Sequence, residues 1–416
     1  MLVQTMTLEV SRMGSTYHLA QQVFDVDGNI PDAQATLQWK VPLFFGSGKK
    51  RKVIWLLENE TVTVENTGHP FLIDVDSNGY YRVQYDEVTW NDIIEILLEN
   101  YSSIPGAARS RLLDDSFVLA EAGRIPFKIP LRLSEYLVVE PKVIPIATFL
   151  SRLEILQQRL YRHKRAALID KFIIYLLQPT FDEVIKRHRV RRISKLEERE
   201  ELILYRICAT GHAECVKMFR PYFDELRVSC GIKKLSDFCN RLDPSMRSVV
   251  YMVGSRFGNY SDFEFLRRNF ETEEYQIERD RIFKALAFST NHTSIVRLAK
   301  YVLSVKERDT DFRPKIYDFT RKNYENGVIS NYFHENFNEI FENHRKYAGW
   351  FMQQMVQMYV TLEDVKKLDL FETKYRSLSP VMSKIVARFK SEILRRIQWI
   401  DRYADDIFKF LATKCV

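Results

Sequence analysis

The spacing of apolar residues changes once along the chain, near Asp86. Before that residue, apolar and polar positions alternate in short runs separated by turn residues, which is typical of half-buried β-strands. These runs predict strands at residues 5–10, 17–24, 35–43, 52–57, 61–64 and 80–85. Two small sheets packed face to face would bury the apolar side chains of these alternating runs, so we expect a β-sandwich domain over residues 1–86. Its last strand should pack Tyr80, Tyr81 and Tyr85 against the first helix, because aromatic side chains need burial.

After Asp86 the apolar residues recur every three or four positions, as in Trp90, Ile93, Ile94 and Leu97. This period predicts amphipathic helices. The longest predicted helices span residues 144–161, 166–177, 196–209, 212–226, 246–257, 260–270, 275–288, 294–302 and 381–411. Helices of this length joined by short turns bury their apolar faces by stacking, although no strict sequence period is visible. The predicted fold class is therefore mostly α, with the β-sandwich followed by an irregular HEAT/armadillo-like α-superhelix over residues 87–416.

The composition argues against a membrane-spanning segment and a signal peptide in this chain. The 416 residues are 46% hydrophobic, without an uninterrupted apolar run long enough to cross a bilayer. Residues 1–15 lack the charged start and apolar centre of a signal peptide. We therefore expect no membrane contact by this chain, and any targeting signal would belong to a longer parent protein.

Two segments near the change of period carry the most specific signal. Residues 78–86 read Asn-Gly-Tyr-Tyr-Arg-Val-Gln-Tyr-Asp, and residues 109–123 read Arg-Ser-Arg-Leu-Leu-Asp-Asp-Ser-Phe-Val-Leu-Ala-Glu-Ala-Gly. The first resembles the signature that closes the β-domain of the gluzincin-type zinc aminopeptidases, and the second resembles the helix that opens their C-terminal domain. Segments around Tyr136, Pro244 and Trp399 continue the resemblance in the family's order across nearly the whole chain. The family includes aminopeptidase N and the endoplasmic-reticulum and puromycin-sensitive aminopeptidases.

The chemistry of that family requires residues that this chain lacks. The family binds zinc with His-Glu-x-x-His and a later Glu, and it grips the substrate amine with Gly-x-Met-Glu-Asn; neither motif occurs here. The only His-Glu pair is His334-Glu335, and Asn338 stands where the second His would be. We predict no catalytic residue and no metal site in the chain, with zinc only in a separate catalytic domain. We expect His334 on an ordinary amphipathic helix whose buried side holds Tyr332, Phe333, Phe337, Ile340 and Phe341.

The resemblance implies a non-catalytic C-terminal region that forms a bowl over the active site and contacts peptide substrate. The expected partners are the aminopeptidase catalytic domain in cis and the peptide, from which the parent enzyme would remove N-terminal amino acids. Arg109 and Tyr136 match family positions near the substrate and are the candidate substrate-binding residues; for Arg109 a structural ion pair with Asp114, Asp115 or another domain is the alternative. For the whole chain, the alternative is a stand-alone helical-repeat interaction module or a pseudoenzyme without peptidase activity.

The cysteines and the N-glycosylation sequons indicate in which cellular compartment the protein is expected. Cys208 and Cys215 resemble the Cys-x6-Cys bridge of the family's extracellular and lumenal members, the alternative being two buried thiols. Cys230 and Cys239 either pair with each other or remain thiols, which leaves Cys415 as the odd cysteine. Candidate glycosylation sites are Asn59, Asn100, Asn259 and Asn291. Together these features predict a glycoprotein in the extracellular space or the secretory lumen, or the ectodomain of a membrane-anchored parent.

A basic run at residues 186–195 and a formal net charge of +7 raise the question of nucleic-acid binding. Four glutamates follow at once, which offers i,i+4 pairing on a solvated helix. No aromatic residue lies within the run to stack on a base. We therefore expect no nucleic-acid partner.

Overall fold

The computed structural model describes residues 5–414 except 27–29, 31, 47, 66–70, 305–311, 323–326 and 380. Its contacts divide the chain into two compact units. Unit 1 comprises Met1–Glu154 with Asp406–Val416, and unit 2 comprises Ile155–Asp405. The β-rich residues and the first helices thus share one compact unit, and the predicted domain boundary at Asp86 stays a prediction.

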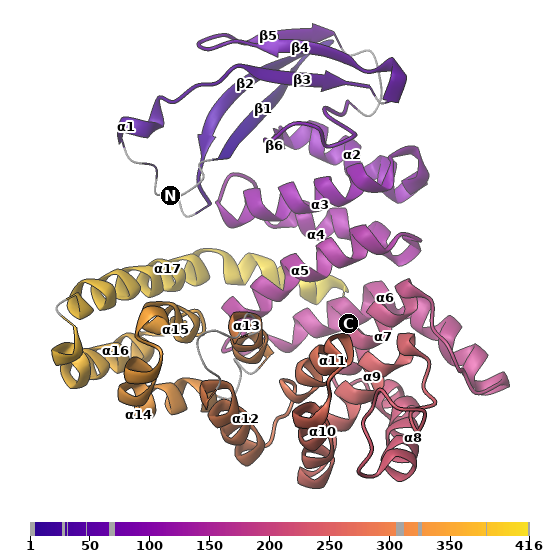
Figure 1. Ribbon diagram of the computed structural model, residues 1–416. Helices are drawn as coiled ribbons and strands as arrows, with labels where there is room; N and C mark the ends of the chain where they lie inside the picture. The colour runs from indigo at the N-terminus through magenta and orange to yellow at the C-terminus, as the bar shows by residue number, and fades with distance from the viewer. Residues whose placement is uncertain are drawn as a thin grey trace. The chain divides into compact units, whose positions relative to one another are not determined.

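The strands of unit 1 form two small sheets (Figure 1). The four-stranded sheet has the order β5-β2-β1-β6, and the two-stranded sheet pairs β3 with β4. The strands are β1 (Thr5–Met13), β2 (Thr16–Phe24), β3 (Val41–Phe45), β4 (Lys52–Leu56), β5 (Val62–Glu65) and β6 (Arg82–Tyr85). All neighbouring strands are antiparallel except β1 and β6, which run parallel because the intervening chain returns from the second sheet.

One aromatic residue joins the two sheets of unit 1. Phe71 stacks on Tyr17 of β2 at 3.7 Å between ring centroids, and it lies 6.4 Å from the ring of Phe45 on β3. Leu8, Leu19, Leu43 and Leu56, from four different strands, are all completely buried. The alternation in the sequence therefore produces one shared core, as two facing sheets require.

The predicted strand at residues 35–43 is wrong over most of its length. A short helix, α1, covers Asp32–Ala35, and β3 begins only at Val41. The backbone of Trp39 pairs with a side chain instead of a strand, because its N–H donates to Gln21 Oε1 and its carbonyl accepts from Gln21 Nε2, both at 2.8 Å. The amide of Gln21 thus takes the place of a strand neighbour, which the alternation of residues 36–41 did not show.

Helices α2 (Glu87–Asn100), α3 (Gly106–Glu121), α4 (Lys128–Leu133) and the first part of α5 (Val143–Leu160) complete unit 1, with the end of α17. The Asp86 carboxylate accepts from the N–H of Thr89 at 2.8 Å and so caps α2. Tyr85 lies edge-on to the buried Trp90 of that helix, 5.2 Å between centroids. Tyr81 is also buried, but Tyr80 is 80% exposed, so the expected burial is wrong for Tyr80.

The regular elements among the described residues of unit 2 are all helices. Its helices are α6 (Ala167–Val190), α7 (Glu198–Ala209), α8 (Ala213–Cys230), α9 (Pro244–Arg256), α10 (Tyr260–Thr272), α11 (Gln276–Leu286), α12 (His292–Ser304), α13 (Phe312–Lys322), α14 (Val328–Asn343), α15 (Ala348–Val356), α16 (Leu362–Tyr375) and most of α17 (Met382–Lys414). Helix α7 packs on α6 and α9, and α9 packs in turn on α8, α10 and α11, so neighbouring hairpins cover one another. The prediction of a mostly α fold with small N-terminal sheets is confirmed.

Short 3₁₀ helices connect several elements: η1 (Gly48–Lys50), η2 (Tyr101–Ser103), η3 (Ser134–Val139), η4 (Arg345–Tyr347) and η5 (Arg376–Leu378). No helix among the described residues is long and apolar enough to cross a membrane.

Helix α6 extends further than its predicted end at residue 177. It continues through Pro179 to Val190, because Phe181, Val184 and Ile185 prolong its buried face. The basic run therefore straddles the end of α6. Two of its arginines pair with glutamates of other helices, since Arg187 contacts Glu200 of α7 at 2.6 Å and Arg192 contacts Glu225 of α8 at 2.7 Å.

Candidate functional site

The His334-Glu335 pair lies on α14, as predicted. Phe333, Phe337 and Ile340 are buried, while Tyr332 and Phe341 are only half-buried. The Nε2 atom of His334 is hydrogen-bonded to the hydroxyl of Tyr359, and burial lowers the pKa of His334 to about 4. Across the described residues, no three His, Cys, Asp or Glu side chains gather closely enough to hold a metal ion. These residues thus offer no set of ligands that fits zinc.

Arg109 and Tyr136 lie at one place, around a third residue that the sequence analysis did not single out. Arg109 Nε and Nη2 donate to the two carboxylate oxygens of Glu140 at 2.7 and 2.6 Å. Arg109 Nη1 also donates to the carbonyl of Ile104 at 2.5 Å. Burial alone would lower the pKa of Arg109, but the hydrogen bonds that it donates to Glu140 raise it. This forked pair fixes the first turn of α3 to the residue that follows η3.

Neither candidate side chain is available at the surface. Arg109 is 4% exposed and Tyr136 is 1% exposed. Burial, followed by the charge of Glu140, raises the pKa of Tyr136. The structure thus gives Arg109 a structural ion pair, though with Glu140 and not with the expected Asp114 or Asp115. A direct contact of either residue with peptide stays a prediction.

Asp114 and Asp115 of α3 belong to a second group of charges in unit 1. Arg82 of β6 lies 2.7 Å from both carboxylates, and Arg152 of α5 lies 2.5 Å from Asp114. The Asp115 carboxylate also accepts from the backbone N–H of Val83 at 3.0 Å. Burial alone would raise the pKa of Asp114, but Arg152 and Arg82 lower it. We call these residues, with the Arg111–Asp74 pair described next, the Arg–Asp network.

Arg111 extends the network to the loop before β6. Its Nη1 lies 2.5 Å from Asp74, and its Nη2 donates to the carbonyl of Tyr81 at 2.7 Å. Asp74 in turn accepts from the N–H groups of Asn78 and Gly79, both at 2.7 Å. The loop that carries Tyr80 is therefore held against α3 by charge-assisted hydrogen bonds.

A cavity of about 420 Å³ opens beside the Arg–Asp network. Tyr80 lines it with its exposed ring, and the hydroxyls of Ser110 and Thr148, 2.7 Å apart, face the same space. An exposed aromatic ring beside hydroxyl groups can stack on a side chain and hydrogen-bond to a peptide backbone. Sequence reasoning missed this cavity. The sequence held no signal for it, because the fold alone brings Arg82 next to the adjacent aspartates of α3.

Two disulfides lie in unit 2. Cys208 at the end of α7 is joined to Cys215 on α8, with Cα atoms 5.2 Å apart, across a turn in which Gly211 has a φ of 85°. A positive φ favours glycine, so the turn that brings the two cysteines together depends on it. Cys230 is joined to Cys239, with Cα atoms 4.9 Å apart. Cys415 lies outside the described residues.

Comparison with known protein families matches residues 70–390 to the ERAP1-like C-terminal domain. The chain belongs to this family. The match begins before β6 and continues into α17, so it includes the Arg–Asp network, the Arg109–Glu140 pair and both disulfides. The resemblance to the C-terminal part of a zinc aminopeptidase is confirmed.

Individual relatives agree with the family assignment. The chain is 29% identical to the aminopeptidase-like protein AC3.5 of Caenorhabditis elegans over 296 residues, which are 68% of this chain and 27% of that protein. It is 24% identical to endoplasmic reticulum aminopeptidase 2 of Bos taurus over 97% of this chain and 43% of that protein. It is 23% identical to aminopeptidase N of Homo sapiens over 91% and 40%, respectively. The chain therefore spans less than half the length of these relatives.

The four sequon asparagines of the chain are all exposed, and all except Asn59 lie within the part that matches the ERAP1-like domain. Asn100 and Asn259 each accept, through Oδ1, a hydrogen bond from the hydroxyl two residues later, Ser102 at 2.7 Å and Ser261 at 2.8 Å. Asn259 and Asn291 also cap helices through the same oxygen, accepting from the N–H of Asp262 and Ser294. A glycan attaches to the amide nitrogen, so these contacts are compatible with modification.

Proposed function

We propose that this chain is the non-catalytic C-terminal region of a zinc aminopeptidase, where it covers the active site and contacts the peptide. The parent enzyme would remove N-terminal amino acids from peptides, with zinc-bound water as the nucleophile supplied by the catalytic domain. One observation carries the proposal: the family match covers residues 70–390, while relatives named as aminopeptidases are more than twice as long as the part they share with this chain.

Within unit 1, the cavity beside Tyr80 is the best-supported place for a peptide contact. The Tyr80 side chain in its lining is 80% exposed, in contrast to Arg109 and Tyr136, and the loop that carries Tyr80 is held in place by Asp74 and Arg111. We assign Arg109 and Tyr136 a positioning role. They would fix η3 and the start of α5, where Val139 and Ile144 are 53% and 67% exposed and available to peptide side chains.

The proposed compartment is the extracellular space or the secretory lumen. Two disulfides in one unit favour an oxidising environment. Among the relatives, one is named an endoplasmic reticulum aminopeptidase and another, from Rattus norvegicus, a thyrotropin-releasing hormone-degrading ectoenzyme. The exposed sequon asparagines agree with this route, and non-reducing peptide mapping with glycan analysis tests it directly.

The first test asks whether the chain acts alone. The purified chain should contain no stoichiometric zinc and release no product from aminoacyl fluorogenic substrates, because its described residues offer no ligand set. About one zinc per chain with chelator-sensitive hydrolysis would contradict the proposal.

The second test asks whether unit 1 contacts peptide in the full-length enzyme. Tyr80→Ala should raise KM for peptides of about ten residues while leaving hydrolysis of a single aminoacyl amide unchanged, since only the longer substrate reaches beyond the reacting residue. Tyr175→Ala is the matched control, because Tyr175 is also exposed, at 42%, but lies on α6 of unit 2. Equal effects of both variants, or no effect of Tyr80→Ala, would contradict a peptide contact at the cavity beside Tyr80.

A further inference from the structure

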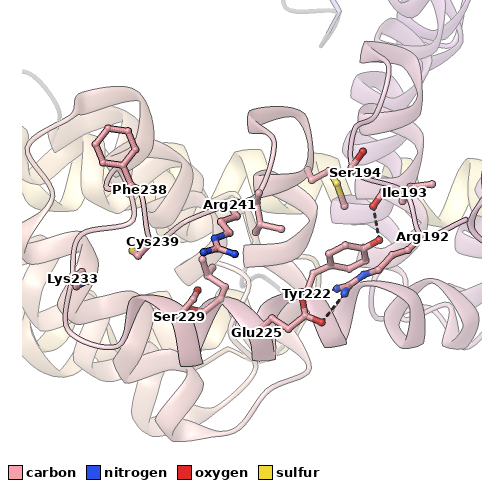
Figure 2. Close-up of a pocket in the computed structure, with 13 residues that line it drawn as sticks. Arg192, Ile193, Ser194, Tyr222, Glu225, Ser229, Lys233, Phe238, Cys239 and Arg241 are labelled. Atoms are coloured by element: carbon pink, nitrogen blue, oxygen red, sulfur yellow. Dashed lines mark hydrogen bonds and ion pairs between the residues drawn. The ribbon is translucent and has the colours of Figure 1, made fainter.

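A second, larger cavity lies entirely within unit 2, between the end of α6, the second half of α8 and the loop that leads to α9 (Figure 2). Its volume is about 760 Å³, which is in the range of sites that hold peptides and small ligands. We call it the α8–α9 cavity. Nothing in the proposed aminopeptidase role uses it.

The loop that forms one wall is fixed from three sides. The Cys230–Cys239 disulfide ties it to the end of α8. Asn240 Nδ2 donates to the carbonyl of Leu235 at 2.9 Å and to the hydroxyl of Tyr251 at 2.7 Å. The Glu273 carboxylate accepts from the N–H and the hydroxyl of Ser236 at 3.0 and 2.7 Å. A wall held in this way loses little conformational entropy when a partner binds.

Three cations line the α8–α9 cavity, and they differ in how they are paired. Arg192 lies 2.7 Å from Glu225 and stacks over the ring of Tyr222 at 4.0 Å. Lys233 and Arg241 are exposed, and no carboxylate among the described residues pairs with either. One carboxylate thus faces three cations, and the lining keeps an excess of positive charge.

An apolar side chain stands at the rim. Phe238 is fully exposed, at 102%, and it lies between the lining residues Lys233 and Arg241 in sequence (Figure 2). Ile232 and Val228, next to the lining residues Lys233 and Ser229, are 92% and 87% exposed. Exposed apolar side chains beside unpaired cations are a feature of binding surfaces rather than of ordinary solvated surface.

We propose that the α8–α9 cavity binds an acidic, extended segment of a partner protein. A carboxylate of that segment would accept hydrogen bonds from the Arg241 guanidinium and the Lys233 ammonium, and a neighbouring apolar side chain would pack on Phe238. A bilayer fits less well, because a planar lipid surface does not fill a concave cavity of about 760 Å³, whereas an extended segment can lie in it.

The test selects peptides from a random phage-displayed library on the full chain at low salt. Enriched peptides should contain Asp or Glu beside an aromatic or aliphatic residue. Synthetic copies should lose affinity at least about tenfold on the variant Lys233→Glu with Arg241→Glu, because two attractive contacts become repulsive. The matched control, Lys171→Glu with Lys300→Glu, makes the same change in net charge at exposed lysines on α6 and α12, and should bind as the original chain does.

The variant Phe238→Ala tests the proposal independently of the charge reversal. Phe238 makes no buried contact, so its truncation should leave circular dichroism and thermal stability unchanged while it weakens peptide binding several-fold. The proposal is overturned if no acidic peptides are enriched, if enriched peptides bind the double charge reversal equally well, or if phosphatidylserine vesicles bind in a Phe238-dependent manner and the peptides do not. Because only binding to this chain is measured, these outcomes are independent of aminopeptidase activity.

Discussion

The Arg–Asp network of unit 1 and the α8–α9 cavity of unit 2 show two opposite uses of charge. In the network, every arginine lies within hydrogen-bond distance of an aspartate, and Asp74 and Asp115 are almost fully buried. In the cavity, two of the three cations are exposed without a described carboxylate partner. Buried charges must be paired because desolvation is costly, whereas exposed unpaired charges cost little and remain available to a ligand. The pairing of charges thus distinguishes the structural network from the proposed recognition site in this chain.

The largest expected effect follows from removing residues 1–86. This deletion takes away Asp74 and Arg82, the partners of Arg111 and of Asp114 and Asp115, and it uncovers Trp90 on α2. We expect aggregation, with the helices of unit 2 keeping their circular dichroism. A truncated chain that stays monomeric in size-exclusion chromatography, with undiminished thermal stability, would show that the β-region is an independent domain.

Breaking the network at one residue should have the next largest effect. Asp115→Ala leaves Arg82 and Arg111 without one of their carboxylates and the N–H of Val83 without its acceptor. We expect a loss of about 3–5 kcal/mol in the free energy of unfolding, measured in urea. The control Asp92→Ala removes a partly exposed pair with Arg12 and should cost about 1 kcal/mol or less. Similar losses for both variants would refute the contrast between buried and exposed charges.

Removing the Cys208–Cys215 disulfide should be milder. The bridge closes a short loop, with a sequence separation of 7, so replacing both cysteines by serine should cost about 2 kcal/mol through the entropy of the unfolded chain. Thermal denaturation of protein made through a secretory pathway checks this value. Recovery of both residues as free thiols in that material, by peptide mapping without reduction, would move the protein toward a reducing compartment.

The smallest effect concerns His334, a half-buried base of unit 2. Its pKa is lowered to about 4 in the folded protein, and the nearby cations Lys367 and Lys374 add to the effect of burial. Between pH 6.5 and 4 the unfolded chain binds a proton that the folded chain does not, so stability should fall as the pH falls through this window. From pH 7 to 5 we expect a loss on the order of 1 kcal/mol.

His334→Gln should flatten that part of the stability profile, because glutamine does not titrate. The variant and the original chain are compared by urea unfolding at several pH values between 7 and 5. An unchanged pH slope in the variant would mean that other groups dominate the acid sensitivity.

The sequence by itself determined the elements whose pattern is local. Helical periodicity placed α5 and α17 to within a few residues, and the motif around Asp86 marked where strands end and helices begin. The same motifs identified the family, since their order along the chain is preserved. At Pro179 of α6 a helix-breaking residue interrupts the helical periodicity. There, only the buried face formed by Phe181 and Val184 decided how far the helix continued.

The tertiary structure alone decided which charges meet. Arg109 and Glu140 are far apart in the chain, and no periodicity favours their pairing over one with the nearer Asp114 or Asp115. The backbone of Trp39 is hydrogen-bonded to the side chain of Gln21 and not to a neighbouring strand. Tyr80 is exposed, although its neighbour Tyr81 is buried. In each case the outcome depends on which distant group lies within hydrogen-bond distance after folding. Local sequence fixes the apolar face of a helix or strand, but it cannot fix the partner of a polar group.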